Sequence, residues 1–468
     1  MTHLRRRPAL LAAVPLAVTA LLAAADPALA AGGVGAPGVG DPCFPLAGNG
    51  GYHVDHYDLT VRYDPVSRRL EGKAVLTARA TQRLTRFDLD LHGLKVTGLT
   101  VDRAEARHRR HGQELVVTPR RALRKGERFR VTVAYSGVPG PVTDPDGSLD
   151  GWIPTDDGAF VASEPQGAMT WFPANNHPTD KSSYDITLTV PEGRTAVANG
   201  VLLGQRTAHG KTTFRWRQTE PMAAYLATAT IGKFRVERFT TRDGVKVYNA
   251  VDPREAGAAA PVLKKLPSVL EWESRLFGRY PFRAAGAVVD RAPQAGYALE
   301  TQTRPVYDRA PDLGTLVHES AHQWFGDSVS LTSWKDIWLN EGFATYTEWL
   351  YAEQHGGDSA QKTFDALYAT PAGDELWAFP PGNPGGENIF GTPVYARGAM
   401  ALHALRTAVG DRAFFRVLRA WAAEHRHGNG TTAQLERLAE RLSGKELGGL
   451  FRTWLYARGK PNVSQKTR

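Results

Sequence analysis

The sequence has almost no cysteine, which excludes a fold held together by disulfide bonds. Its 468 residues include one cysteine, Cys43, and a single thiol cannot form an intramolecular disulfide. Cys43 follows Pro42 and lacks the small-residue box of a lipoprotein. We interpret it as an incidental thiol, because one cysteine alone is not a metal site.

Long apolar runs are also scarce. The one clear run, residues 9–25, follows arginines at positions 5–7 and precedes Ala28-Leu29-Ala30. This order is typical of an export signal. A membrane anchor is the alternative, but a spanning helix needs about 20 apolar residues. We therefore expect a signal peptide, residues 1–30, cleaved near Ala30, and a secreted, extracellular protein without stable membrane insertion. The choice between Sec and twin-arginine export stays open.

Clustered charge of one sign is missing. The formal net charge is +9, yet lysines and arginines are scattered among acidic residues rather than gathered in one stripe. A nucleic-acid partner would require a clustered basic face. The sequence therefore indicates a soluble, mildly basic surface and no nucleic-acid partner.

Helical periodicity is nearly absent from residues 52–236. Apolar residues alternate there with polar ones, as Tyr57, Leu59 and Val61 do along the first run. Alternation with a period of two predicts half-buried strands. We expect this half to be an antiparallel β-domain.

The segments on either side of the β-domain have different patterns. Residues 31–51 are rich in Gly and Pro and poor in large apolar residues, which predicts a flexible leader. After about residue 255 the apolar residues recur at helical spacing, as Phe414, Leu418 and Trp421 do. The predicted fold class is α+β, with a β-half at 52–236 and a mostly helical half at 237–468.

A zinc motif opens the chemistry of the second half. Residues 318–322 read His-Glu-Ser-Ala-His within a helix-compatible run at 313–325. Positions i and i+4 share a helix face, so His318 and His322 can bind one ion, while Glu319 can reach a water beside it. Two surface histidines on a helix are the alternative, because the short motif also arises by chance.

A third metal ligand is available nearby. Glu341 follows the motif after eighteen residues, and Tyr346 and Leu350 continue a helical spacing after it. Catalytic zinc sites use three protein ligands and keep one position open. A second helix packed on the first could therefore present Glu341 to the same ion.

These motifs resemble the M1 family of zinc aminopeptidases, a branch of the gluzincins. The shared runs are His-Gln-Trp-Phe-Gly at 322–326 and Asn-Glu-Gly-Phe-Ala at 340–344. The resemblance implies a saddle-shaped N-terminal β-domain at 52–236 and a thermolysin-like catalytic domain at 237–468. The resemblance is to short family members that lack the large C-terminal helical domain of many relatives. Such a short form is expected to have a cleft that is more open on one side.

The resemblance also implies residues that bind the substrate. The family anchors the substrate amine with the Glu of a GAMEN-like motif, here Glu300 with Gly296 and Ala298, although Tyr297 and Thr301 depart from the pattern. A second amine contact precedes a PxxDxP-like segment, here residues 173–178. Counting back nine positions gives Glu164, with Gln166 as the fallback, and Asn176 replaces the usual acid.

Two further residues complete the expected site. In the family a Tyr followed by x-Lys/Arg-Gly donates to the oxyanion, and Tyr395 with Arg397 fits this pattern. A core tyrosine at a helix entry is the alternative. Glu348 lies on the same helical face as Glu341 and either orients a zinc-bound histidine or is a solvated helix acid.

The predicted function is hydrolysis of the first peptide bond of peptides that have a free amino terminus. The resemblance implies one Zn²⁺ per chain, with Glu319 as general base. A thermolysin-like endopeptidase, a bifunctional epoxide hydrolase and a non-catalytic binding module are the alternatives. The preferred first residue, the maximum peptide length, the biological substrate and the oligomeric state cannot be read from the sequence.

Overall fold

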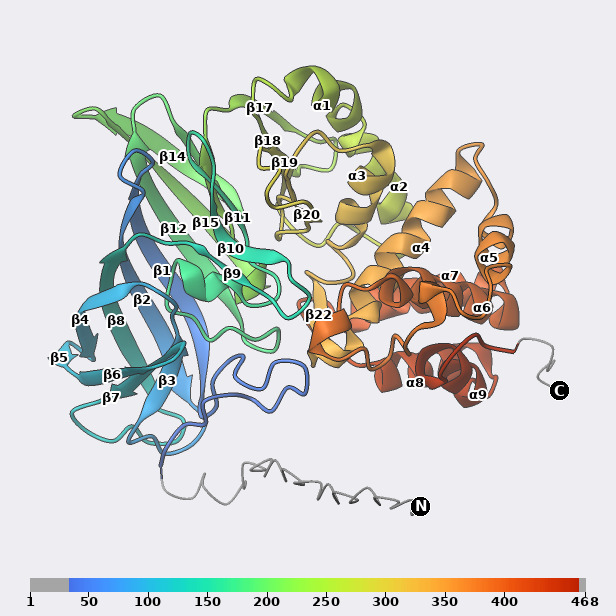
Figure 1. Ribbon diagram of the computed structural model, residues 1–468, viewed down its shortest axis with the longest axis horizontal. Helices are drawn as coiled ribbons and strands as arrows, with labels where there is room; N and C mark the ends of the chain where they lie inside the picture. Colours follow the sequence, from blue (N-terminus) through green and yellow to red (C-terminus); the bar gives the residue numbers. More distant parts are fainter. Residues whose placement is uncertain (1–32, 463–468) are drawn as a thin grey trace, which may run out of the picture.

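The computed structural model describes residues 33–462, so the expected signal peptide lies outside the described residues. Strands dominate the first half of the chain and helices the second, and the two halves lie side by side as two domains (Figure 1). The predicted α+β fold class, with a β-rich domain before a helical catalytic domain, is confirmed.

A large sheet forms the body of the first domain. Its central strand buries Tyr57, Leu59 and Val61 while Asp58 and Arg62 are exposed, as the alternation predicts. The neighbours of this strand are antiparallel on one side and parallel on the other, which departs from the purely antiparallel expectation. In spatial order the eight strands are β14 (Val201–Ala208), β15 (Lys211–Ala223), β12 (Lys181–Pro191), β1 (Tyr52–Asp64), β2 (Arg69–Ala80), β8 (Arg128–Gly137), β4 (Lys95–Val101) and β5 (Ala104–Glu105).

Two smaller sheets complete the β-domain. One carries the loops that reach the functional site, and the other covers an end of the large sheet (Figure 1). The first runs β13 (Thr195–Ala198), β16 (Ala229–Gly232), β11 (Ala159–Ala162), β10 (Leu149–Pro154) and β9 (Pro141–Thr143). The second runs β3 (Phe87–Asp90), β7 (Glu114–Thr118) and β6 (Arg107–His111).

The domain boundary falls slightly earlier than residue 236. Strand β17 (Arg235–Thr240) pairs with β18 (Lys246–Val251) of the second domain, so it crosses the expected boundary. The change of domain therefore lies between the end of β16 and the start of β17. The remaining strands of this sheet are β19 (Ala284–Val289), β21 (Val306–Tyr307) and β20 (Ala298–Leu299).

Helices make up most of the catalytic domain. The longest, α4, packs against both α3 and α6, which places it at the centre of the domain. The helices are α1 (Ala256–Leu263), α2 (Leu266–Phe277), α3 (Leu313–Ala321), α4 (Trp338–Gln354), α5 (Ala360–Tyr368), α6 (Gly398–Val409), α7 (Asp411–Glu424), α8 (Thr432–Ser443) and α9 (Gly448–Phe451). Strands β22 (Val329–Leu331) and β23 (Gly428–Gly430) pair in parallel beside them. Within residues 33–462, no helix combines the length and apolar character needed to cross a membrane.

The N-terminal segment, residues 33–51, is packed rather than flexible, so the leader prediction is wrong for these residues. The buried Asp41 carboxylate accepts hydrogen bonds from the Ser333 hydroxyl and the Trp334 backbone N–H, both at 2.8 Å. Phe44 packs its ring edge on Trp334. The segment thus reaches from the β-domain to the catalytic domain, as its dark blue trace shows (Figure 1).

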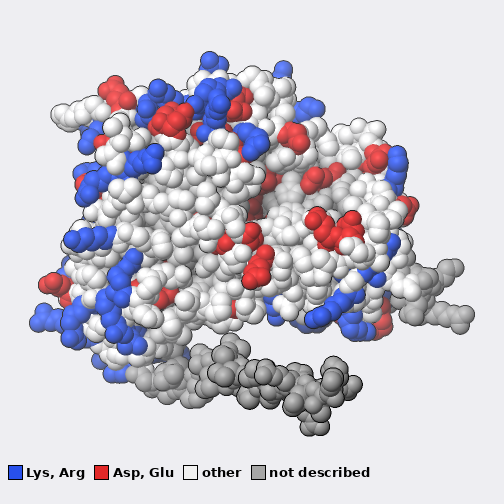
Figure 2. Space-filling view, viewed as in Figure 1, with Lys and Arg blue, Asp and Glu red and all other residues white. Residues whose placement is uncertain are grey.

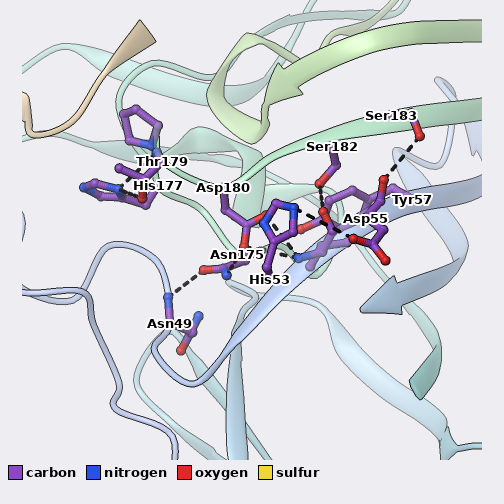
Figure 3. A network of polar contacts seen from close by, with 12 residues as sticks. Asn49, His53, Asp55, Tyr57, Asn175, His177, Thr179, Asp180, Ser182 and Ser183 are labelled. Carbon is purple, nitrogen blue, oxygen red and sulfur yellow. Dashed lines mark hydrogen bonds and ion pairs between the residues drawn. The ribbon is translucent and has the colours of Figure 1, made fainter. Parts of the chain in front are cut away.

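A polar network ties the same segment to the β-domain (Figure 3). The Asn49 backbone N–H donates to the Asn175 side chain at 2.6 Å. Asn175 in turn donates to the Asp180 carboxylate, which also accepts the Val54 N–H and pairs with His53. Turn and polar residues make these contacts, and that is why composition alone suggested flexibility.

Buried cations join the two domains. Lys181 donates to the carbonyls of Asp327 and Ser328 at 2.8 and 3.0 Å. Arg304 is 1% exposed and donates to carbonyls of both domains, including Ala198 at 2.6 Å and Tyr248 at 3.1 Å. These bonds hold the site between the domains in a fixed arrangement.

Candidate active site

Helix α3 presents the first two metal ligands. Its N-cap Asp312 accepts the Thr315 N–H at 2.7 Å, which satisfies an otherwise free donor of the first turn. The helix ends at Ala321, earlier than the expected 325, and His322 takes the C-cap position. One turn of helix still separates His318 from His322, so both imidazoles lie on one face.

Glu341, in the first turn of α4, completes a triad of metal ligands. Its Oε2 lies 3.2 Å from His318 Nε2 and 3.4 Å from His322 Nε2. Ligands about 2.0–2.2 Å from a tetrahedral zinc ion are about 3.3–3.5 Å apart. The three donors therefore fit one zinc ion, and their two-imidazole, one-carboxylate chemistry matches a catalytic site.

The second nitrogen of each imidazole is also held. Glu348 Oε1 lies 2.7 Å from His318 Nδ1, and the Phe325 carbonyl lies 3.0 Å from His322 Nδ1. Such contacts fix the tautomer and leave each Nε2 for the metal. Glu348 therefore lies where it can orient His318, as the first of the two alternatives expected.

Glu319 is buried beside the triad without acting as a ligand of it. Its side chain is 5% exposed, and Oε2 has no hydrogen-bond partner within the described residues. Burial raises the pKa of this carboxyl to about 8, with His318 and His322 opposing the rise. A carboxylate whose pKa lies near neutrality can both accept and return a proton.

Two further buried carboxylates stand next to the zinc ligands. One carboxylate oxygen each of Glu164, Glu300 and Glu341 lies within 4.8 Å of the others. Burial, then the like charges of Glu300 and Glu341, raises the pKa of Glu164 well above its usual value. A cation bound between Glu164 and Glu300 would relieve this repulsion.

Gln323, which the sequence analysis did not single out, places Glu300. Its side-chain Nε2 donates to the Glu300 carbonyl at 3.1 Å, and its Oε1 accepts the Thr303 N–H at 2.8 Å. Gln323 follows directly after His322, so one side chain connects the end of α3 to the segment that carries Glu300. Its place inside the His-Gln-Trp run was the only signal in the sequence.

The loop that carries Glu164 is hydrogen-bonded to the PxxDxP-like segment, residues 173–178. The Asn176 side chain donates to the Gln166 carbonyl at 2.8 Å, so the amide that replaces the usual acid still contacts this loop. The Gln166 side chain donates towards Asp144 at 3.4 Å and is not among the residues that line the site. Gln166 thus has a supporting contact, whereas Glu164 lines the site itself.

Tyr395 lies in a π-helical turn, Pro393–Arg397, that leads into α6. Its ring lies over His318, with the two centroids 6.0 Å apart. Arg397 is fully buried and donates to the carbonyls of Trp454, at 2.8 Å, and Gly459, at 3.0 Å. Burial raises the pKa of Tyr395 well above its usual value, so its hydroxyl keeps a proton to donate.

These groups share one cavity of about 410 Å³ between the domains. Acidic side chains gather around the hollow near β20, and basic ones lie mostly at the periphery of this face (Figure 2). All the expected site residues except Gln166 and Glu348 are in the lining, which includes Gly296, Ala298, Glu164, Glu300, His318, Glu319, His322, Glu341 and Tyr395.

The fold and the site define a metallopeptidase with a two-histidine, one-glutamate metal centre. Two family profiles match the chain: the peptidase M1 N-terminal domain over residues 53–226 and the peptidase family M1 domain over residues 298–454. The chain belongs to peptidase family M1, the family of zinc metallopeptidases that its motifs resemble.

Individual relatives agree with this assignment. Aminopeptidase M1 of Arabidopsis thaliana is 28% identical over 66% of this chain and 38% of its own length. Aminopeptidase 2, mitochondrial, of Saccharomyces cerevisiae is 25% identical over 87% of this chain and 46% of its own length. The chain therefore spans less than half the length of these curated relatives.

Solved structures match the chain over its described length. A crystal structure of an M1 zinc metallopeptidase from Deinococcus radiodurans is 31% identical, with a TM-score of 0.84, over 92% of this chain and 99% of that one. A mutant of the metallopeptidase from that organism, bound to a Tyr-Ser-Ala substrate, matches with the same TM-score of 0.84. The two domains of this chain thus share their arrangement with a solved M1 zinc metallopeptidase.

Proposed function

We propose that this protein is a zinc-dependent aminopeptidase that removes single residues from peptides with a free amino terminus. The observation that carries this proposal is the position of Glu164 and Glu300. Their carboxylate oxygens lie within 4.8 Å of Glu341, the third metal ligand. A substrate ammonium bound there leaves room for one residue before the bond that is cut.

The chain's own residues account for the proton transfers. A zinc ion held by His318, His322 and Glu341 would supply Lewis acidity for the carbonyl and lower the pKa of a bound water. Glu319 accepts a proton from the water that attacks the first peptide carbonyl. It then returns the proton to the leaving nitrogen.

Tyr395 stabilises the charge that develops on the carbonyl oxygen. Its hydroxyl is protonated because burial holds its pKa well above the usual value. A donor placed where an oxyanion forms is worth more in the transition state than in the ground state. The Arg397 contacts with the C-terminal backbone hold the turn that carries this hydroxyl.

A peptide panel tests the amine anchor. We expect the enzyme to cut Leu-containing tripeptides with a free amine and to leave the N-acetylated versions intact. Glu300→Ala should lower kcat/KM for free-amine peptides by about 10²-fold or more, because a buried charge pair is lost. Equal cleavage of acetylated and free peptides by the wild-type protein would contradict the proposal and favour the endopeptidase alternative.

We also propose one zinc ion per chain and secretion after signal cleavage. The triad of His318, His322 and Glu341 supports the first, because among the candidate groups of the described residues it is the one with two imidazoles. The apolar stretch before Ala30 supports the second. Metal analysis should give one zinc per chain, and treatment with a chelator should abolish peptide cleavage. N-terminal sequencing of protein recovered from the medium should begin at about residue 31.

A further inference from the structure

The hairpin of β9 and β10 lies between the two loops that carry the amine-binding carboxylates. The Leu149 carbonyl accepts a hydrogen bond from the Tyr297 hydroxyl at 2.7 Å. Tyr297 lies three residues before Glu300 in the chain. The next residue of the hairpin contacts the other loop, because the Asp150 carboxylate accepts a hydrogen bond from the Gln166 backbone N–H at 2.7 Å. Gln166 lies two residues after Glu164 in the chain. The turn of this hairpin, residues 144–148, is thereby fixed at the cavity, where Asp146 and Ser148 join Glu164 and Glu300 in the lining.

Asp146, in this turn, is the one carboxylate of the cavity without a role in the mechanism. Five carboxylates line the cavity, and no lysine or arginine of the described chain does. Glu341 binds the metal, Glu319 transfers the proton, and Glu164 and Glu300 hold the amine. The negative charge of Asp146 is therefore in excess of what amine binding requires.

The Asp146 carboxylate is both oriented and accessible. Its Oδ1 accepts the Ser148 N–H at 2.9 Å and the Ser148 hydroxyl at 2.7 Å. Among the described residues nothing donates to Oδ2, and the side chain is exposed towards solvent. The half-buried rings of Tyr297 and Phe390 line the same cavity and provide apolar walls.

We infer that Asp146 makes the enzyme prefer substrates whose first residue is arginine or lysine. This inference rests on the proposed aminopeptidase function. The aliphatic stem of such a side chain would pack on Tyr297 and Phe390, and its cationic end would meet Asp146. Because the carboxylate is partly solvated, it contributes to selectivity rather than to catalysis.

Arginyl and citrullinyl reporters test the charge directly, because citrulline has nearly the shape of arginine without the positive charge. The wild-type enzyme should show a higher kcat/KM for the arginyl reporter, by about three- to tenfold, as expected for a partly exposed charge pair. Asp146→Asn should remove this preference and leave the kcat/KM for a leucyl reporter within about twofold. Added salt should reduce the preference in the wild-type enzyme.

The control is Asp58→Asn, an exposed acid on β1 of the same β-domain that does not line the cavity, which should keep the wild-type ratio of arginyl to citrullinyl rates. If Asp146→Asn keeps the wild-type ratio of arginyl to citrullinyl rates and still cleaves the leucyl reporter, the role of Asp146 is overturned and the proposed aminopeptidase function stands. If the wild-type enzyme cleaves no aminoacyl reporter at all, the proposed function itself fails. The two failures are therefore distinguishable.

Discussion

Glu319 shows at the scale of one residue how much the sequence can predict. Helical geometry alone placed His318 and His322 on one face and Glu319 beside it, and the structure has this arrangement. Glu341 could be suggested from the need for a third ligand on a second helix, whereas Tyr395 required the family pattern, because nothing in its local sequence shows that it meets the histidines. Contacts between distant residues are visible only in the folded chain.

Replacing Glu319 with Gln should remove the proton acceptor and keep the metal site. We expect kcat for a free-amine peptide to fall by about 10²–10⁴-fold, the usual contribution of general acid–base catalysis. Zinc content should stay at the wild-type level, because Glu319 is not one of the three ligands. Peptide hydrolysis and metal analysis of the same preparation check both parts.

Glu192→Gln is the matched control, since Glu192 is an exposed acid in the β-domain. It should have wild-type activity and metal content. Wild-type turnover in Glu319→Gln would end the assignment of Glu319 as general base.

At the scale of elements, the connection between α3 and the segment after β20 positions Glu300, the amine anchor of the proposed function. Strand and helix patterns predicted these elements but not their contact. Gln323 makes this contact through the Glu300 carbonyl and the Thr303 N–H, and both partners are buried. A single amide in the turn after α3 therefore holds the backbone of the segment that carries the Glu300 carboxylate.

Gln323→Leu should displace Glu300 while leaving the zinc ligands in place. We expect KM for free-amine peptides to rise by about tenfold with a smaller change in kcat, because losing a buried hydrogen bond costs about 1–3 kcal/mol. The preference for free over N-acetylated peptides should weaken in parallel. Steady-state kinetics with both substrates and zinc analysis provide the measurement.

Tyr280→Phe separates this positioning role from general packing. The Tyr280 hydroxyl donates to Gln323 Oε1 at 3.4 Å and to the Ala284 carbonyl at 3.0 Å, so its hydrogen bonds do not include the Glu300 backbone. This variant should keep the wild-type KM. A parallel fall of kcat and zinc content in Gln323→Leu would instead indicate disruption of the metal site.

At the scale of the whole molecule, the two-domain order was predictable and the way the domains are joined was not. Periodicity separates strands from helices, and the structure confirms that order. The interface depends on Arg304 and Lys181, whose donors meet backbone carbonyls far away in the sequence. The prediction of a flexible leader at residues 33–51 failed for the same reason, because partners far away in the sequence order the polar and turn residues of this segment.

Asp41→Ala should loosen the N-terminal segment and destabilise the protein. The change leaves the buried Trp334 N–H and the Ser333 hydroxyl without their acceptor, at a cost of about 2–4 kcal/mol. Denaturant unfolding measures the loss, and limited proteolysis should show earlier cleavage within residues 33–51. Unchanged stability and proteolysis would show that the segment does not join the domains.

The pH dependence of this contact follows from the Asp41 carboxyl. Burial alone would raise its pKa, but hydrogen bonds from His177 and the Trp334 N–H hold it below the usual 3.8. A carboxyl with a lowered pKa stabilises the folded state above its unfolded pKa and loses this effect as the pH falls through the folded value. The stability difference between wild type and Asp41→Ala should therefore persist at pH 5 to 7 and shrink only below about pH 4.

The Asp41 contact also bears on the order in which the protein is made. Ser333 lies 292 residues after Asp41 in the chain. During synthesis the segment around Asp41 therefore leaves the ribosome before Ser333 is made. Its bonds to the β-domain can form first, and its bond to the catalytic domain can form only after 292 further residues have been added.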